Sequence, residues 1–136
     1  MAELLEFWET SYEQAIQLVQ ADYENDPVTT MKFLLPRFLA IPHEAEGALR
    51  AWGHTNPMVG AAVRRQNQRW VESVTAAHAA MIENPERRRL VAWMFVSLMI
   101  GIQLHERPID RTLMAAAIVE FGRQHLGIQF EYKAAE

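Results

Sequence analysis

The densest group of side chains that could hold a metal or move a proton is His43, Glu44 and Glu46. Imidazole nitrogens and carboxylate oxygens are common zinc ligands, and a helical site needs them one turn apart on one face. His43 has no second histidine at helical spacing, and nearby carboxylates are common on solvated helices. We therefore expect no metal site and no cofactor.

Other catalytic groupings are missing from the sequence. It contains no cysteine, which excludes thiolate zinc sites and cysteine nucleophiles. It also lacks a Gly-rich phosphate loop, a nucleophile elbow and a pair of carboxylates directed into a core. We expect no catalytic residues and a protein that is not an enzyme.

Arginines form two groups, one at Arg64, Arg65 and Arg69 and the other at Arg87–Arg89. Neither group alternates with aromatic residues as in single-strand binders. The formal net charge of −4 is also a poor match to nucleic acid. We interpret both groups as solvated helix faces with ion pairs.

Aromatic and methionine side chains are a stronger signal, because the sequence has four Trp and seven Met. Trp8, Trp52, Trp70 and Trp93 fall on four different predicted helices. Flat aromatic rings and pliable methionines suit a pocket for apolar molecules. Ordinary core packing is the better explanation for any single one of them, whereas a cavity would involve some of them jointly, so both interpretations stay open.

Composition and length indicate one globular domain that stays out of the membrane. Half of the 136 residues are hydrophobic and 22% are charged. Residues 1–6 are acidic and do not resemble a signal peptide. The longest uncharged apolar run, Leu90 to Ile102, has thirteen residues, whereas a membrane span needs about 20. We expect a soluble, cytoplasmic protein.

Apolar residues recur at three- and four-residue steps along most of the chain, which predicts an all-α fold. Asx–Pro pairs at residues 26–27, 56–57 and 84–85 each predict a helix start. Pro36 should kink its helix or end it early. Residues 128–136 should fray or pack as an extended arm. The predicted helices cover residues 2–21, 27–40, 42–52, 57–83, 85–105 and, after the Asp110 cap, 111–126.

Several segments resemble the ligand-binding half of tetracycline-repressor-type (TetR family) transcription regulators. They are the run GALRAWG at 47–53, Asn56-Pro57, the run VRRQNQR at 63–69 and the apolar step LMIG at 98–101. The resemblance covers residues 2–126. Gln66 departs from the family pattern, in which an Asp is frequent at that position.

The resemblance implies a single effector-binding and dimerisation domain over residues 1–136. The family's helix-turn-helix head needs about 45–50 residues ahead of Leu4 and is not in this sequence. We therefore expect no sequence-specific DNA binding by this sequence alone, since a recognition helix is needed to enter the major groove.

Residues at four-residue spacing predict a pocket for a small hydrophobic or aromatic effector. Trp70, Val74 and His78 form one such line, and the pairs Trp8–Tyr12 and Leu34–Phe38 form two more. His78 and Tyr12 would supply its polar groups. The predicted ligand-binding residues are Trp8, Tyr12, Leu34, Phe38, Trp70, Val74, His78 and Met94.

The helix over 85–105 is apolar nearly all round after its first turn, and a six-helix domain would struggle to cover every face of it from within. A symmetric partner would supply the missing cover, as the family's dimer does with a four-helix bundle formed by the last two helices. The predicted interface residues are Phe95, Leu98, Ile102, Met114, Ala117, Ile118 and Phe121. The alternative is a ligand-free helical scaffold that dimerises with a complete regulator and counteracts it.

Overall fold

We describe residues 1–11, 26–105, 108–129 and 131 of a computed structural model of the chain. These residues contain α-helices and no β-strand, as the sequence predicts. The first helix covers residues 2–11 and is called the N-terminal helix below. The others are α2 (Pro27–Leu39), α3 (His43–Gly53), α4 (Pro57–Ala77), α5 (Pro85–His105) and α6 (Arg111–Phe121), with a 3₁₀ turn at His78–Ala80 and a π turn at Gly122–Leu126.

The three Asx–Pro pairs begin helices α2, α4 and α5, which confirms the predicted starts. The side-chain oxygen of Asn56 accepts from the backbone N–H of Met58 at 3.0 Å, and that of Asn84 accepts from Arg87 at 2.9 Å. Asp26 caps α2 in the same way. Each cap satisfies a backbone donor that has no partner inside its helix.

One predicted boundary is wrong, and another lies outside the described residues. Helix α2 continues past Pro36 to Leu39, within one residue of its predicted end. Both Pro36 and Lys32, whose carbonyl loses its bond, lie on the exposed side, where water can replace that bond. The helix predicted over 57–83 ends at Ala77, where the 3₁₀ turn begins. Residues 12–21 of the first predicted helix are outside the described part.

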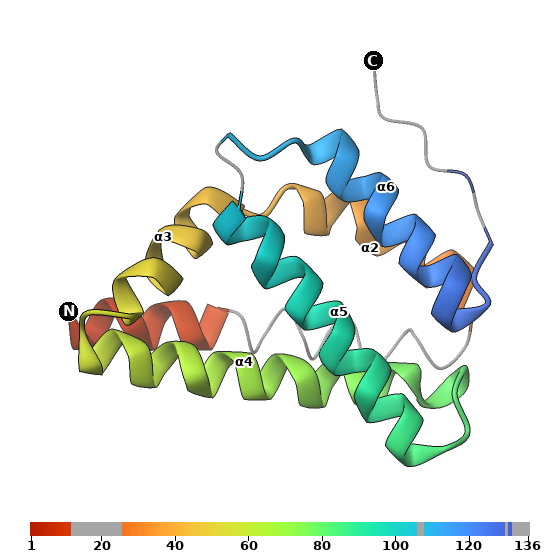
Figure 1. Ribbon diagram of the computed structural model, residues 1–136, viewed down its shortest axis with the longest axis horizontal. Helices are drawn as coiled ribbons and strands as arrows, with labels where there is room; N and C mark the ends of the chain where they lie inside the picture. The colour runs from red at the N-terminus through yellow and green to blue at the C-terminus, as the bar shows by residue number, and fades with distance from the viewer. Residues whose placement is uncertain (12–25, 106–107, 130, 132–136) are drawn as a thin grey trace.

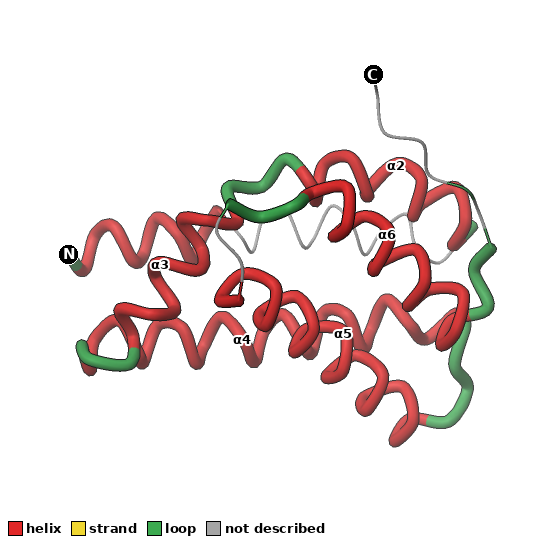
Figure 2. The backbone as a smooth tube through the Cα atoms, turned by 45° about the horizontal axis from the view of Figure 1, so that its top comes forward, coloured by secondary structure: helices red, strands yellow, loops and turns green. Residues whose placement is uncertain are grey.

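The helices form two groups that meet along α5 (Figure 1). The N-terminal helix and α4 lie along one side, and α5 crosses α4. On the other side α2 packs against α6, and both views show these two helices next to each other (Figure 2). The short helix α3 packs against both α4 and α5.

The largest hydrophobic cluster lies between α2, α4, α5 and α6. It contains Leu35, Trp70, Met99 and Ile118, all buried. A second cluster fills the end of the molecule where α6 finishes, and it includes Ile128. The backbone N–H of Ile128 bonds to Gly122 at 3.1 Å, so the beginning of the tail is packed and not frayed.

Candidate functional site

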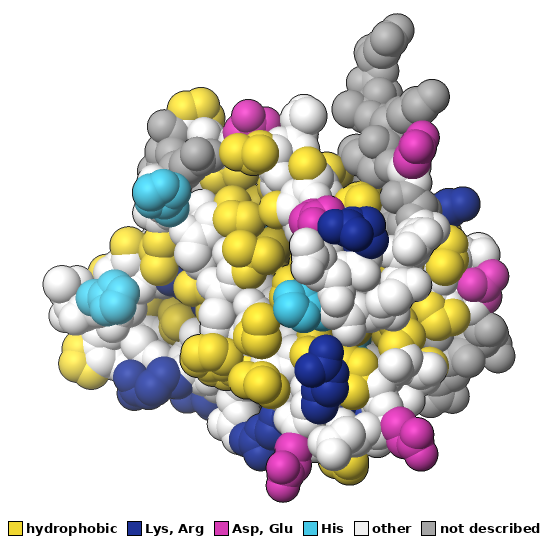
Figure 3. All heavy atoms as spheres, turned by 45° about the vertical axis from the view of Figure 1, so that its right-hand side comes forward, with side chains coloured by type: hydrophobic (Ala, Val, Ile, Leu, Met, Phe, Trp, Pro, Cys, Tyr) yellow, Lys and Arg dark blue, Asp and Glu magenta, His cyan; other side chains and the backbone are white. Residues whose placement is uncertain are grey.

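α5 leaves four large apolar side chains exposed in the single chain, and they spread over about 140° of its circumference. Leu90, Trp93, Leu98 and Leu104 are 55%, 58%, 37% and 41% exposed. No charged residue interrupts α5 between Leu90 and Leu104. The space-filling view shows hydrophobic side chains gathered in a band across one face of the molecule (Figure 3). We call the surface formed by these four residues the α5 face.

The opposite side of α5 is buried, so the helix carries apolar residues both toward the core and toward its exposed side. Ala92, Val96 and Met99 are buried on its inner side. On the outer side, an added Cβ at Gly101 would meet nothing within 4 Å. The expectation that one chain leaves part of this helix uncovered agrees with this arrangement. Within the described residues, no helix has the length and apolar character needed to cross a bilayer.

The predicted interface residues do not all lie on this uncovered surface. Leu98 is exposed there, whereas Phe95, Ile102 and Ala117 are half-buried. The structure places the other three in the chain's own core, because α6 turns its apolar side inward against α2 and α5: they are Met114, Ile118 and Phe121.

Sequence reasoning missed the exposed residues Leu90, Trp93 and Leu104 as interface candidates. Leu113, at the start of α6, is also 58% exposed and was not among them. Their apolar character was visible in the sequence. The direction of their side chains was not, because a helix that is apolar all round has no polar side to show which face is outside.

Part of the predicted pocket comes together around Phe38 and Trp70. Their ring centroids are 6.2 Å apart, and Val74 packs on the same cluster. Leu34 is half-buried on α2. Met94 belongs to the neighbouring cluster at the end of α6. Phe38, Trp70, Val74 and Met94 are therefore packed among core side chains.

Trp8 is not part of this group, and Tyr12 lies outside the described residues. The indole Nε1–H of Trp8 donates to Oε1 of Glu46 at 2.7 Å. Its ring packs against a separate cluster of Leu5, Val59 and Ala62. The spacing of Trp8 and Tyr12 therefore does not bring Trp8 to Trp70.

The buried side of α4 carries polar groups without partners among the described residues. Gln66 is 1% exposed, and neither atom of its side-chain amide makes a hydrogen bond. His78, at the end of the same line, is 4% exposed, and its Nδ1 is unpaired. Unpaired polar atoms in an interior are uncommon and destabilise the fold.

Burial lowers the pKa of His78 from 6.5 to about 4, because the charged imidazolium would lose its hydration. As the pH falls from 6.5 toward 4, the His78 ring is therefore protonated in the unfolded chain before it is protonated in the folded chain. We expect acidification to about pH 4 to lower the free energy of unfolding by roughly 3 kcal/mol through this group. Below that pH both states are protonated and the loss stops growing.

Urea unfolding at a series of pH values measures this effect. The variant His78→Phe should lose the His78 part of the pH dependence, whereas His105→Phe, on an exposed side chain, should keep it. If the parent and His78→Phe show equal slopes between pH 4 and 6.5, the assignment to His78 is wrong.

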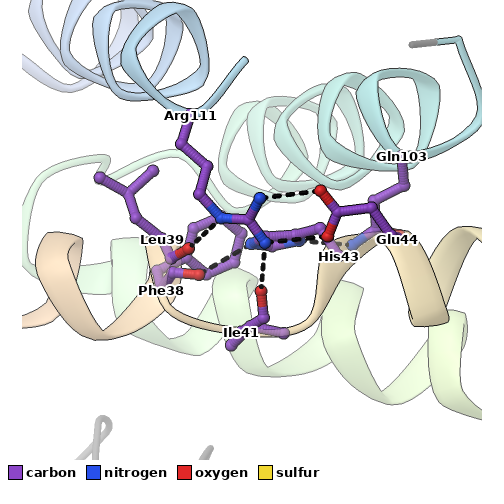
Figure 4. A network of polar contacts seen from close by, with 7 residues as sticks. All are labelled: Phe38, Leu39, Ile41, His43, Glu44, Gln103 and Arg111. Carbon is purple, nitrogen blue, oxygen red and sulfur yellow. Dashed lines mark hydrogen bonds and ion pairs between the residues drawn. The ribbon is translucent and has the colours of Figure 1, made fainter. Parts of the chain in front are cut away.

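A buried polar network ties the two groups of helices together (Figure 4). His43 Nε2 lies 2.8 Å from the carbonyl oxygen of Phe38, and its Nδ1 lies 3.0 Å from the Gln103 Nε2 donor. The Oε1 of Gln103 accepts from Arg50 Nε at 2.8 Å, and Arg50 also donates to Asn67. The network thus joins α2, α3, α4 and α5, and burial lowers the pKa of His43 so that its ring stays neutral.

Arg111 holds the beginning of α6 against the corner between α2 and α3 (Figure 4). It bonds both oxygens of Glu44, at 2.8 and 2.9 Å, and the carbonyl oxygen of Leu39 at 2.9 Å. The hydrogen bonds from Arg111 lower the pKa of Glu44 to about 2. Glu44 and His43 therefore have structural partners, and no group of three metal-ligating side chains occurs in the described chain.

Two surface hollows are present away from the predicted pocket. The larger, about 410 Å³, lies beside the tail and is lined by Val119, Arg123 and Ile128 among others. The smaller, about 220 Å³, lies between the N-terminal helix and α4, beside Leu5 and Arg65. Neither is lined by a residue that the sequence assigns to ligand binding.

Comparisons with known proteins give no relative from which a role could be carried over: no family model, no curated protein and no solved structure matches the chain.

Proposed function

We propose that this chain is a dimerisation domain that pairs with a second copy of itself through the α5 face. The observation that carries the proposal is the uncovered apolar surface formed by Leu90, Trp93, Leu98 and Leu104. Large apolar side chains left exposed along one helix are typical of interaction sites. A two-fold axis would place the same apolar surface on both sides of the contact.

The order of the helices supports a role of the tetracycline-repressor type. In the family that the sequence resembles, a short helix is followed by an Asx–Pro helix start and a long helix. The last two helices of that family pair across the dimer. The chain has α3, Asn56-Pro57 and α4 in that order, followed by α5 and α6. The proposed interface therefore falls on the first of the two helices that the resemblance assigns to the dimer contact.

Sedimentation velocity over a range of concentrations tests this proposal. The parent chain should sediment as a dimer at micromolar concentration, since a specific interface buries at least about 1,000 Å² in total. A monomer over this whole range would contradict the proposal. A monomer that forms a complex only with a complete regulator would instead favour the anti-regulator scaffold.

The second proposed role is the binding of a small effector beside the buried side of α4. The unpaired polar atoms of Gln66 and His78 support it, because they lie on the same line as Trp70. An apolar cavity with a few polar groups is typical of ligand sites, so this role requires the interior beside α4 to open around the guest. The effector would bind inside each subunit of the dimer.

A thermal-shift series with aromatic compounds tests the effector role. A compound that binds the folded state should raise the melting temperature of the parent chain in proportion to its concentration above Kd. The variant Trp70→Leu should lose that rise, while Trp52→Leu, which alters an exposed tryptophan, should retain it. If no compound shifts the parent, or if all shifts survive in Trp70→Leu, the proposed effector role is wrong.

A further inference from the structure

The exposed side of α5 carries two small residues between large apolar ones. Leu90, Trp93 and Leu104 are large and exposed, and Ser97 and Gly101, which are also exposed, lie between Trp93 and Leu104. At 3.6 residues per turn, these five positions fall within about 80° of the helix circumference. They therefore form one narrow strip along the exposed side of the helix.

The surface of this strip is low at Gly101. A Cβ added to Gly101 would meet nothing within 4 Å, so the space above this residue is open. When two helices pack, a large side chain of one enters a hole between four residues of the other. Around Gly101 the four residues with the spacing of such a hole are Ser97, Ile100, Gly101 and Leu104. Two of these four residues are small, so the hole would be wide enough for a large side chain.

The large and small residues are placed symmetrically about Ser97. Trp93 precedes Ser97 by four residues and Gly101 follows it by four, whereas Leu90 and Leu104 are each seven residues away. If two copies of α5 run antiparallel about a two-fold axis at Ser97, Trp93 of one copy lies level with Gly101 of the other. The same axis brings Leu90 of one copy level with Leu104 of the other.

We propose that two α5 helices pair antiparallel about Ser97, with Trp93 of each copy seated over Gly101 of the other. This inference rests on the dimer proposed above and specifies how its two copies recognise each other. The large side chain and the hole that receives it are on the same helix and symmetric about one residue. The partner that this surface fits is therefore a second copy of the chain.

The charges at the beginning of α5 also favour an antiparallel pair. Arg87 and Arg89 are exposed in the first turns of the helix. A parallel pair would place these arginines beside the same residues of the other copy, where like charges repel each other. In the antiparallel pair the two arginine groups are roughly 24–30 Å apart along the helices, at 1.5 Å per residue. This distance exceeds the screening length of about 8 Å at physiological salt.

The exposed part of Trp93 supplies a considerable share of the area that a dimer needs. A fully buried aromatic side chain covers roughly 150–250 Å², and 58% of Trp93 is exposed in the single chain. Two seated tryptophans would therefore bury on the order of 200–300 Å². A specific interface needs about 1,000 Å² in total, so the leucines and their surroundings supply the remainder.

Disulfide cross-linking tests the pairing directly, because the sequence contains no cysteine. Ser97→Cys places a thiol on the proposed axis, so oxidation should link two copies of this single variant. Leu104→Cys alone should not link, since its two thiols would be about 21 Å apart along the helices. A mixture of Leu90→Cys and Leu104→Cys, with a size tag on one of them, should give a linked pair of intermediate size. Ser11→Cys, the same substitution on the exposed side of the N-terminal helix, is the control and should not link.

A second variant fills the proposed seat of Trp93. Gly101→Leu should not lower the melting temperature, because an added Cβ meets nothing and leucine favours a helix more than glycine does. It should raise the dimer dissociation constant at least about tenfold, since the indole of the other copy would be displaced. Ala76→Leu, at an exposed position of α4, should leave that constant unchanged.

Efficient self-linking of both Ser97→Cys and Leu104→Cys would show a parallel pair and overturn this inference. A chain that sediments as a dimer but does not link through Ser97→Cys, or that dimerises equally well with Gly101→Leu, would also overturn it and leave the dimer standing. A chain that sediments as a monomer would overturn the dimer and this pairing together. Sedimentation therefore separates failure of the dimer from failure of the pairing.

Discussion

The substitution Trp93→Glu should convert the dimer into a monomer without unfolding the chain. Trp93 is 58% exposed in the single chain, so its replacement costs the fold little. In the proposed dimer the same position is covered, and the glutamate would lie unpaired in an apolar contact. We expect the dimer dissociation constant to rise at least about 100-fold, measured by analytical ultracentrifugation.

The variant Phe33→Glu is the matched control for this experiment. Phe33 is an aromatic residue with 52% exposure, and it lies on α2 outside the α5 face. This variant should remain dimeric, with thermal unfolding close to that of the parent. If Trp93→Glu stays a dimer, or if Phe33→Glu dissociates equally, the α5 face is not the interface.

Replacing Gln103 with leucine should lower the free energy of unfolding by about 3–5 kcal/mol. Gln103 is fully buried and bonds both Arg50 and the Nδ1 of His43. Leucine has a similar size but can neither accept from the guanidinium nor donate to the imidazole. The buried Arg50 would lose one of its partners and Nδ1 of His43 would be left unpaired, and both changes destabilise the folded state.

Urea unfolding followed by circular dichroism measures this loss. Gln68→Leu replaces an exposed glutamine whose bond to Glu72 lies at the surface, and its effect should stay within about 0.5 kcal/mol. Equal stability of the Gln103→Leu and Gln68→Leu variants would show that the buried network does not hold the helices together.

Helix starts could be predicted because their signals are local. The capping oxygen of Asn56 and the N–H groups it bonds are within three residues of each other, so the pattern in the sequence contains the whole interaction. The end of α4 was predicted six residues too late, since residues 78–83 keep a helical pattern but the structure has a 3₁₀ turn there. Periodicity does not distinguish a continuous helix from a helix followed by a turn.

The polar contacts between helices could not be predicted, because they join residues that are far apart in the sequence. Trp8 bonds Glu46 across 38 residues, and Arg50 bonds Gln103 across 53. Sequence reasoning singled out His43 but gave no role to Arg50, Gln103 or Arg111. Polar side chains far apart in a chain carry no signal that they will meet inside the fold.

The sequence by itself determined the all-α class, the helix starts and the apolar character of residues 90–102, because each follows from neighbouring residues. Only the tertiary structure decided which side of each helix faces inward. In the tertiary structure Met114 and Ile118 of α6 are buried in the chain's own core, whereas Trp93 of α5 is exposed. The reason is that a helical repeat determines which residues share a face, whereas the packing of the other helices determines which face is covered.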